Sequence, residues 1–210
     1  MKELSISLFI LCLIINCDTK KSKADQLLNL LAIPKSIEPI KISLVGDSLA
    51  AWSEGFRLKT ILRDGYIISI FAQPGADTEF WLANYIKPST TPAQIIIISL
   101  GTNDIGYGKG REYPARLREL IDLSIRKPGV NQIFITTIPL SNQDKLWNEI
   151  KSANQAIRQI QGIKIVEWES ALNPNESYSP FYPMIDPIHP KEEGYEILGQ
   201  ILANRILYPL

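Results

Sequence analysis

The chain contains one histidine, and it stands close to a carboxylate: His189 follows Asp186 by three positions. Far upstream, Ser48 lies in the four-residue segment 46–49, Gly-Asp-Ser-Leu. A serine hydroxyl becomes a strong nucleophile when an imidazole takes its proton, and a carboxylate on the other ring nitrogen fixes the tautomer. The usual imidazole pKa of about 6.5 suits this work near neutrality. These residue types predict nucleophilic catalysis by Ser48, with His189 as base and Asp186 as its orienting acid.

Ser48 is expected at a sharp turn from a strand into a helix. Residues 40–45 are an apolar, strand-like run, and residues 50–62 have a composition compatible with a helix. The first N–H groups of a helix have no partner within it. The hydroxyl of Ser48 would therefore be exposed beside free backbone donors.

Strand-like and helix-like segments alternate from residue 40 to the end of the chain. Strands are predicted over 40–45, 66–72, 94–100, 132–138 and 163–167, and helices over 52–62, 77–86, 113–126, 144–160 and 191–206. This alternation favours an α/β fold, a three-layer α/β/α sandwich around a parallel sheet of about five strands. Ligands of such sheets bind outside the carboxyl ends of the strands. Since Ser48, Gly75 and Asn103 follow the first three strands, all three are expected at one edge of the sheet.

Three motifs in this order make the chain resemble the SGNH hydrolases, also called GDSL-type esterases/lipases, whose fold is flavodoxin-like. The segment 46–49 matches the first motif, Gly-Thr-Asn-Asp at 101–104 matches Gly-x-Asn-Asp, and Asp-Pro-Ile-His at 186–189 matches Asp-x-x-His. The block around Gly75 keeps the family's glycine but not the small residues after it, a departure that concerns the shape of the pocket. The resemblance implies a serine esterase for acyl or acetyl esters. It also implies an oxyanion hole made by the N–H groups of Ser48 and Gly75 and the side chain of Asn103.

Other classes of function compete with an esterase. The α/β-hydrolase elbow, Gly-x-Ser-x-Gly, needs a second glycine where position 50 is alanine. A zinc site is not expected with one histidine and two N-terminal cysteines, and neither a metal nor a cofactor is predicted. Two alternatives stay open: an O-acyltransferase acting on envelope glycans, and a non-catalytic envelope binding module that keeps the fold.

Several further residues have a predicted place. Asp47 and Asp104 are expected to hold turns, and Asn154 to make buried hydrogen bonds. The glycine-dense segment 106–111 is expected to form a rim or lid beside the site. In the loop 173–190, the aromatic residues at positions 178, 181 and 182 either line an acyl or sugar pocket or pack the loop down.

The charge balance indicates the class of partner. Lys plus Arg and Asp plus Glu each total 22, which gives a formal net charge of zero. Without a basic stripe, nucleic acid is not an expected partner. The expected partner is a small-molecule, lipid or glycan ester that serves as substrate.

The first 17 residues differ from the rest of the chain. Lys2 precedes an apolar run at 4–15, and Cys17 is followed by polar residues. The run is too short to span a bilayer, which takes about 20 apolar residues. This pattern resembles a bacterial lipoprotein signal whose cysteine is lipidated, although Asn16 stands where the usual lipobox has a small residue.

Three segments are therefore expected: a signal peptide with its lipobox at 1–17, a tether at 18–39 and the hydrolase domain at 40–210. Lipidation of Cys17 would place an exported protein in the cell envelope, where the lipid anchor alone contacts the membrane. A secreted or periplasmic protein is the alternative. Cys12 would leave with the signal, so no disulfide is expected.

Overall fold

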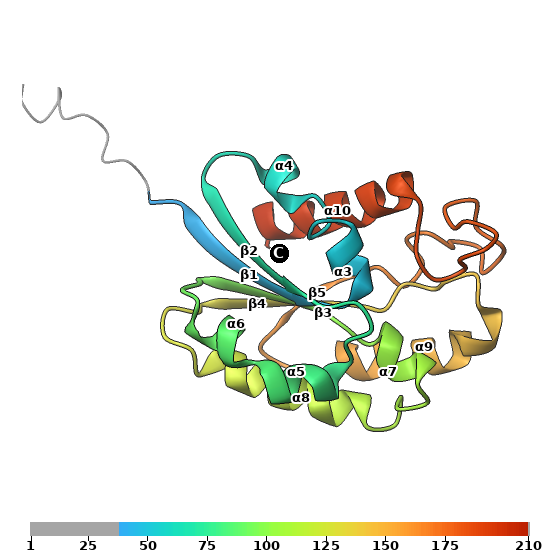
Figure 1. The fold of residues 1–210 in the computed structure, drawn as a ribbon, viewed down its shortest axis with the longest axis horizontal. Coiled ribbons are helices and arrows are strands. Elements are labelled where there is room, and N and C mark those ends of the chain that lie inside the picture. The colour runs from blue at the N-terminus through green and yellow to red at the C-terminus, as the bar shows by residue number, and fades with distance from the viewer. Residues whose placement is uncertain (1–37, 210) are drawn as a thin grey trace, which may run out of the picture. The chain divides into compact units, whose positions relative to one another are not determined.

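Five parallel strands form a sheet between two layers of helices in the computed structural model, which describes residues 38–209 (Figure 1). The strands are β1 (Ile40–Gly46), β2 (Tyr66–Ala72), β3 (Ile95–Ser99), β4 (Gln132–Thr136) and β5 (Lys164–Val166). Their order across the sheet is β2-β1-β3-β4-β5, and every neighbouring pair is parallel. The predicted three-layer α/β/α fold with five strands is confirmed.

The strand order reverses at β1, which pairs with β2 on one side and β3 on the other. Gly46, the last residue of β1, lies opposite Ala72 of β2 and Ser99 of β3. All three strands therefore end at the same level. A reversal of this kind opens a crevice at the carboxyl edge of a parallel sheet, where ligands bind.

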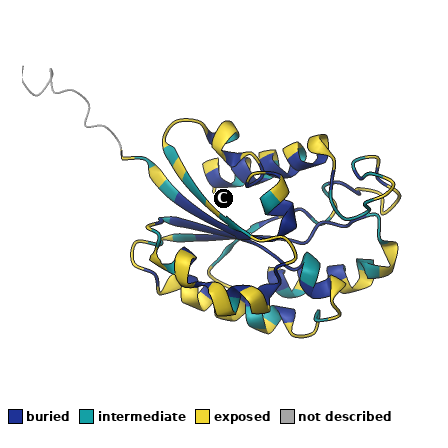
Figure 2. Ribbon diagram, in the orientation of Figure 1, coloured by how far each residue is buried: buried dark blue, intermediate teal, exposed yellow. Residues whose placement is uncertain are grey.

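The two faces of the sheet support separate apolar cores, and Figure 2 shows the buried strands between helices with exposed outer sides. In β3, Ile96 and Ile98 pack with the core under one helical layer. Ile95 and Ile97 point to the other core, because successive side chains of a strand alternate between faces. An unbroken apolar run is thus what a strand buried on both faces requires.

One helical layer combines helices from both ends of the described chain, and the other comes from its middle (Figure 1). One layer packs on the sheet through α3, α4 and α10, and the other through α5, α8 and α9. The helices are α3 (Ser48–Trp52), α4 (Leu58–Leu62), α5 (Thr78–Asn84), α6 (Ile86–Thr90), α7 (Thr102–Gly106), α8 (Tyr113–Ile125), α9 (Trp147–Arg158) and α10 (Glu192–Leu207), with a 3-10 turn, η1 (Asp144–Leu146), before α9.

The prediction of one helix over 52–62 was wrong, because α3 ends at Trp52 and α4 begins only at Leu58. Residues 54–57 all have positive φ angles, between 50° and 70°. A right-handed helix cannot continue through that conformation. Phe56 within this turn is fully buried, so its packing against the core offsets the backbone strain.

Two other predicted helices are also divided in the structure. The region 77–86 is divided between α5 and α6, and 144–160 between η1 and α9. The five-residue helix α7 was not predicted at all. A helix of little more than one turn shows no periodic pattern in the sequence, since its stability comes from tertiary packing.

The predicted signal peptide, almost all of the tether and the lipidation site Cys17 lie outside the described residues 38–209. Within that described part of the chain, no helix is both long enough and apolar enough to cross a bilayer.

Candidate active site

Ser48 is the first residue of α3, directly after the turn that ends β1. The preceding residue, Asp47, caps this helix, since its Oδ1 accepts a hydrogen bond from the backbone N–H of Leu49 at 2.9 Å. An aspartate in this position satisfies one of the free N–H groups at a helix N-terminus. The predicted turn role of Asp47 is observed, and the cap fixes the backbone on which the Ser48 hydroxyl stands.

A continuous series of side-chain hydrogen bonds joins the serine to the two predicted partners from the far end of the chain. The Oγ atom of Ser48 lies 2.8 Å from Nε2 of His189. Nδ1 of the same imidazole lies 2.8 Å from Oδ2 of Asp186. A neutral imidazole with its proton on Nδ1 donates to the carboxylate and accepts from the hydroxyl, and this is the arrangement that a general base requires.

The carboxylate of Asp186 is held in its charged form. Partial burial acts in the opposite direction, but the backbone N–H groups of His189 and Ile188 and the imidazole together lower the pKa of Asp186. Those backbone bonds to Oδ1 are 3.0 and 3.1 Å long. Hydrogen bonds to a carboxylate favour its ionised form. Asp186 thus presents a fixed negative charge to the imidazole.

Trp52 is a close neighbour of the imidazole that sequence reasoning missed. The ring centroids of Trp52 and His189 are 3.9 Å apart, with the planes inclined at 40°. Trp52 stands four residues after Ser48 in α3, and residues at this spacing share one side of a helix. That spacing was the available signal. The indole is 57% exposed, so it covers the histidine from the solvent side.

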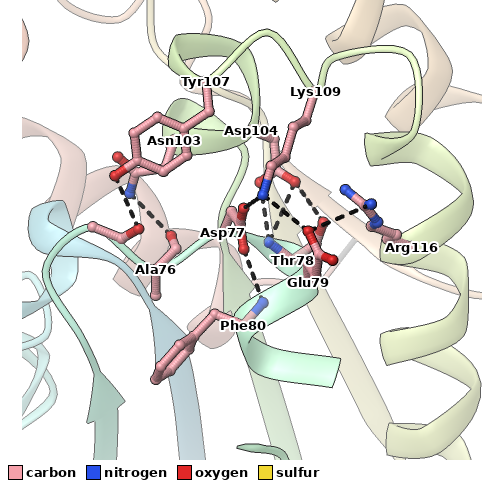
Figure 3. A network of polar contacts seen from close by, with 11 residues as sticks. Ala76, Asp77, Thr78, Glu79, Phe80, Asn103, Asp104, Tyr107, Lys109 and Arg116 are labelled. Atoms are coloured by element: carbon pink, nitrogen blue, oxygen red, sulfur yellow. Dashed lines mark hydrogen bonds and ion pairs between the residues drawn. The ribbon is translucent and has the colours of Figure 1, made fainter. Parts of the chain in front are cut away.

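The second and third motif blocks are joined by hydrogen bonds from α7, and from the residue that follows it, to the loop after β2 (Figure 3). Nδ2 of Asn103 donates to the carbonyl oxygen of Ala76 at 2.9 Å. The hydroxyl of Tyr107 donates to the carbonyl oxygen of Gly75 at 3.2 Å. Gly75 has a φ of +78°, a conformation that favours glycine. The structure therefore brings Gly75 and Asn103 together at the carboxyl edge of the sheet.

A polar network behind these two residues holds the same loop (Figure 3). Asp104, fully buried, accepts a hydrogen bond from the backbone N–H of Thr78 at 3.2 Å. The ammonium of Lys109 lies 2.7 Å from Asp77 and 2.9 Å from Glu79. Asp104 thus holds a turn, as predicted, and Lys109 bonds the segment 106–111 to the start of α5.

Burial makes the carboxyl groups of Asp47 and Asp104 weaker acids than usual. Desolvation raises the pKa of Asp47 to about 7, despite the hydrogen bond from Leu49, and raises the pKa of Asp104 as well. The Oδ2 atom of Asp47 is buried, and no hydrogen-bond partner for it lies among the described residues. A carboxyl in such surroundings favours the neutral form.

Asn154 and the aromatic residue Tyr182 of the loop 173–190 have mainly structural contacts. Asn154 is fully buried and bonds both the N–H and the carbonyl of Ile138, at 2.7 and 2.8 Å, as expected. Tyr182 is buried and donates to the carbonyl of Leu140 at 3.0 Å, so this aromatic packs the loop down. Tyr178 is 63% exposed. Among residues 38–209, no cluster of three or more His, Cys, Asp or Glu side chains is arranged to hold a metal ion.

Residues 44–197 match the model of the GDSL-like Lipase/Acylhydrolase family. The chain belongs to this family. The matched range contains all five residues predicted for catalysis and the oxyanion hole. It also contains the carboxyl edge of β1, β2 and β3, where three of those five residues follow the strands.

Known proteins resemble this GDSL-like chain at low sequence identity. A multidomain esterase of Ruminococcus flavefaciens is 29% identical over 135 residues, which are 59% of this chain and 16% of that relative. The chain thus spans about a sixth of this curated relative. Among solved structures, a lipolytic protein of the G-D-S-L family from Veillonella parvula has a TM-score of 0.67 at 17% identity, over 77% of this chain and 95% of that one.

A catalytic mutant of an acetylxylan esterase from Geobacillus stearothermophilus has a TM-score of 0.64 at 19% identity, over 81% of this GDSL-like chain and 95% of that chain. Likeness at this identity shows a common fold. The three-layer α/β/α fold of the GDSL-like chain is therefore shared with this acetylxylan esterase and the lipolytic protein.

Proposed function

We propose that this GDSL-like protein hydrolyses carboxylic esters, with Ser48 as nucleophile, His189 as general base and then acid, and Asp186 as the group that orients the imidazole. The observation that carries this proposal is the unbroken series of bonds from Ser48 through His189 to Asp186, each 2.8 Å long. Membership in the GDSL-like Lipase/Acylhydrolase family supports it.

The reaction begins when Oγ of Ser48 attacks the carbonyl carbon of the ester and its proton passes to Nε2 of His189. Asp186 stabilises the imidazolium that forms. When the tetrahedral intermediate collapses, the bond to the alcohol oxygen breaks and His189 returns the proton to that oxygen. Water, activated by the same imidazole, then releases the acyl group from Ser48 as a free acid.

Three donors are proposed to stabilise the oxyanion of each intermediate. The N–H of Ser48 lies at the start of α3, where helix N–H groups have no partner within the helix. The N–H of Gly75 and the side-chain amide of Asn103 complete the set. One of the two amide hydrogens of Asn103 is bonded to Ala76, which aims the amide and leaves the second hydrogen for the substrate. Donors fixed in advance stabilise developing charge more than mobile ones.

The proposal is tested by intact mass spectrometry of the purified protein after treatment with a fluorophosphonate probe. One adduct is expected on the unmodified chain, and none on Ser48→Ala or His189→Ala. Circular dichroism of both variants checks that they are folded. A folded protein that forms no adduct would favour a non-catalytic binding module. Acyl product diverted from free acid to an added sugar acceptor would favour an O-acyltransferase.

We also propose that the protein is exported and tethered to the cell envelope by a lipid on Cys17. The signal-like pattern of residues 1–17 supports this proposal. A Cys17→Ser variant is expected to move from the membrane fraction to the soluble fraction and to lose incorporation of labelled fatty acid. Equal membrane retention of both forms would contradict lipidation.

A further inference from the structure

A cavity of about 640 Å³ lies between α3, the turn after it, α4, β2 and the beginning of α10. The three helices lie together on one face of the sheet, and β2 is the edge strand of that sheet (Figure 1). Trp52 forms one wall of the cavity and is also the residue whose ring contacts the imidazole of His189. The volume is in the range of small-molecule sites, about 300–1,000 Å³. One indole thus separates this cavity from the catalytic base.

The walls of the cavity carry polar groups of several kinds. Arg57 and Glu192 form an ion pair at its border, and Thr60 adds a hydroxyl. An alkyl chain would gain little here, because it would desolvate charged groups without giving them a partner. A sugar ring suits such walls, since its hydroxyls bond carboxylate and guanidinium groups while its C–H face packs on an aromatic ring. The exposed indole of Trp52 offers that ring.

A buried hydroxyl in the cavity wall has no partner. Tyr195 is 8% exposed and lines the cavity, and no hydrogen-bond partner for its hydroxyl lies among residues 38–209. A buried polar group without a partner costs about 1–3 kcal/mol. The oxygen itself is enclosed, so a ligand hydroxyl would reach it through a small shift of the surrounding side chains and supply the missing bond.

The direction of the reaction assigns the cavity to the alcohol part of the ester. His189 must return its proton to the leaving oxygen, so the alcohol leaves on the imidazole side of Ser48. Trp52 covers that side and leads to the cavity. The acyl group lies on another side, since its carbonyl oxygen has to face the proposed donors of Gly75 and Asn103.

Space for the acyl group is small. A hollow bordered by Leu49, Thr102 and Ile188, the direct neighbours of Ser48, Asn103 and His189, has a volume of only about 10 Å³. A single water needs about 10–15 Å³ measured in this way. Ile105 and Ile150 also line the hollow, with apolar side chains. A hollow of this size does not take a long alkyl chain.

We propose that Trp52 and the cavity that it borders bind a sugar unit on the alcohol side of the ester, so that the substrate class is a glycan carrying a short acyl group such as acetyl. This inference rests on the proposed ester hydrolysis and adds the substrate class to it. Trp52 packs against the sugar ring, and Tyr195 bonds one of its hydroxyls.

The experiment compares two substrates with the same acyl group, a mono-O-acetylated oligosaccharide and 4-nitrophenyl acetate. The ratio of kcat/KM for the sugar ester to kcat/KM for the nitrophenyl ester is measured for the full chain and its variants. Trp52→Ala is expected to lower this ratio at least tenfold, chiefly by raising KM for the sugar ester. Tyr195→Phe is expected to lower it about threefold to tenfold. Tyr208→Ala, which removes an exposed aromatic side chain that does not border this cavity, is the matched control with an unchanged ratio.

Each outcome separates the two proposals. Loss of activity on both substrates in equal proportion, with an unchanged ratio in Trp52→Ala and Tyr195→Phe, would overturn the sugar site while leaving ester hydrolysis in place. Faster hydrolysis of nitrophenyl octanoate than of nitrophenyl acetate would overturn the short acyl group. A protein that hydrolyses none of these esters and takes no fluorophosphonate would instead refute the proposed function. Calorimetric binding of the deacetylated oligosaccharide to Ser48→Ala, and its loss in Ser48→Ala/Trp52→Ala, would support the site without any turnover.

Discussion

Asn103 and Ala76 are joined by a 2.9 Å hydrogen bond from the asparagine side chain to the alanine carbonyl oxygen, across the ends of β3 and β2. The bond fixes the direction of an amide that would otherwise rotate freely. It also ties the loop of Gly75 to α7, so that two of the proposed oxyanion donors form one rigid unit (Figure 3). Fixed donors at this point agree with a site built to stabilise charge at the carboxyl edge of the sheet.

Removal of this amide is expected to affect turnover far more than stability. Asn103→Ala should lower kcat by about 10²–10³ because one oxyanion donor is lost. The free energy of unfolding should fall by about 1 kcal/mol through loss of the bond to Ala76. Steady-state kinetics and urea unfolding measure the two effects. Asn84→Ala, at an exposed asparagine of α5, is the matched control. Full kcat in Asn103→Ala would exclude it as an oxyanion donor.

The charge of Asp186, and not only its shape, is expected to support catalysis. Asp186→Asn keeps an oxygen for the backbone N–H groups of Ile188 and His189, so the loop should stay folded. The amide cannot stabilise the imidazolium, and kcat should fall by about 10³–10⁴. Because the pKa of Asp186 is lowered, its own titration should not limit the rate between pH 5 and 9 in the unmodified protein. Rates measured across this range test both statements, and near-normal turnover of the amide variant would contradict the role.

Asp47 is expected to make stability depend on pH. Burial raises its folded-state pKa to about 7, against an ordinary value of 3.8. Between these values the folded state binds a proton that the unfolded state has released, so stability falls as pH rises from about 4 to 7 and then levels off. Unfolding by urea at a series of pH values measures this fall.

Asp47→Asn isolates that contribution, since an asparagine still caps α3 but does not titrate. As the pH rises from about 4 to 7, the unmodified chain should lose a few kcal/mol of stability relative to the variant. This corresponds to about 1.4 kcal/mol for each unit of pKa shift. At pH 7 the variant should be the more stable protein. A difference between the two chains that stays constant with pH would show that the pKa of Asp47 is not raised.

Lys109 is expected to position the loop of Gly75 through its two ion pairs. Lys109→Met keeps the length of the side chain and removes its contacts with Asp77 and Glu79. Because exposed ion pairs contribute little to folding, stability should change only slightly. The kcat should fall several-fold, since a looser loop places an oxyanion donor less well.

Lys151→Met is the matched control, because the partner of Lys151 among the described residues is Glu176, an exposed side chain. High salt should reduce the kcat of the unmodified protein toward that of Lys109→Met, since salt screens exposed charges. Equal kcat for the unmodified protein and Lys109→Met at low salt would show that the loop is held without this side chain.

Much of the fold was open to prediction from the sequence. The strand limits at Tyr66–Ala72 match the prediction at both ends, and the other strands agree to within two residues, because short runs rich in β-branched and aromatic residues, bounded by turn residues, indicate strands. The alternation of strands and helices then required a parallel sheet, and the carboxyl ends of its strands required Ser48, Gly75 and Asn103 at one edge. The split of 52–62 into two helices was missed, because positive φ angles at Glu54, Phe56 and Arg57 follow from packing.

The sequence by itself determined the family, the sheet and the types of residue available for chemistry, since these depend on local patterns and on the order of motifs. Tertiary structure alone decided the contact of Trp52 with His189, the bond of Asn103 to Ala76 and the cavity beside α10. Each of these joins segments that are distant in the chain. Their geometry is set by how helices pack on the sheet. The spacing of Ser48 and Trp52 places both on one side of α3, but no local pattern of residues records which distant residue packs there.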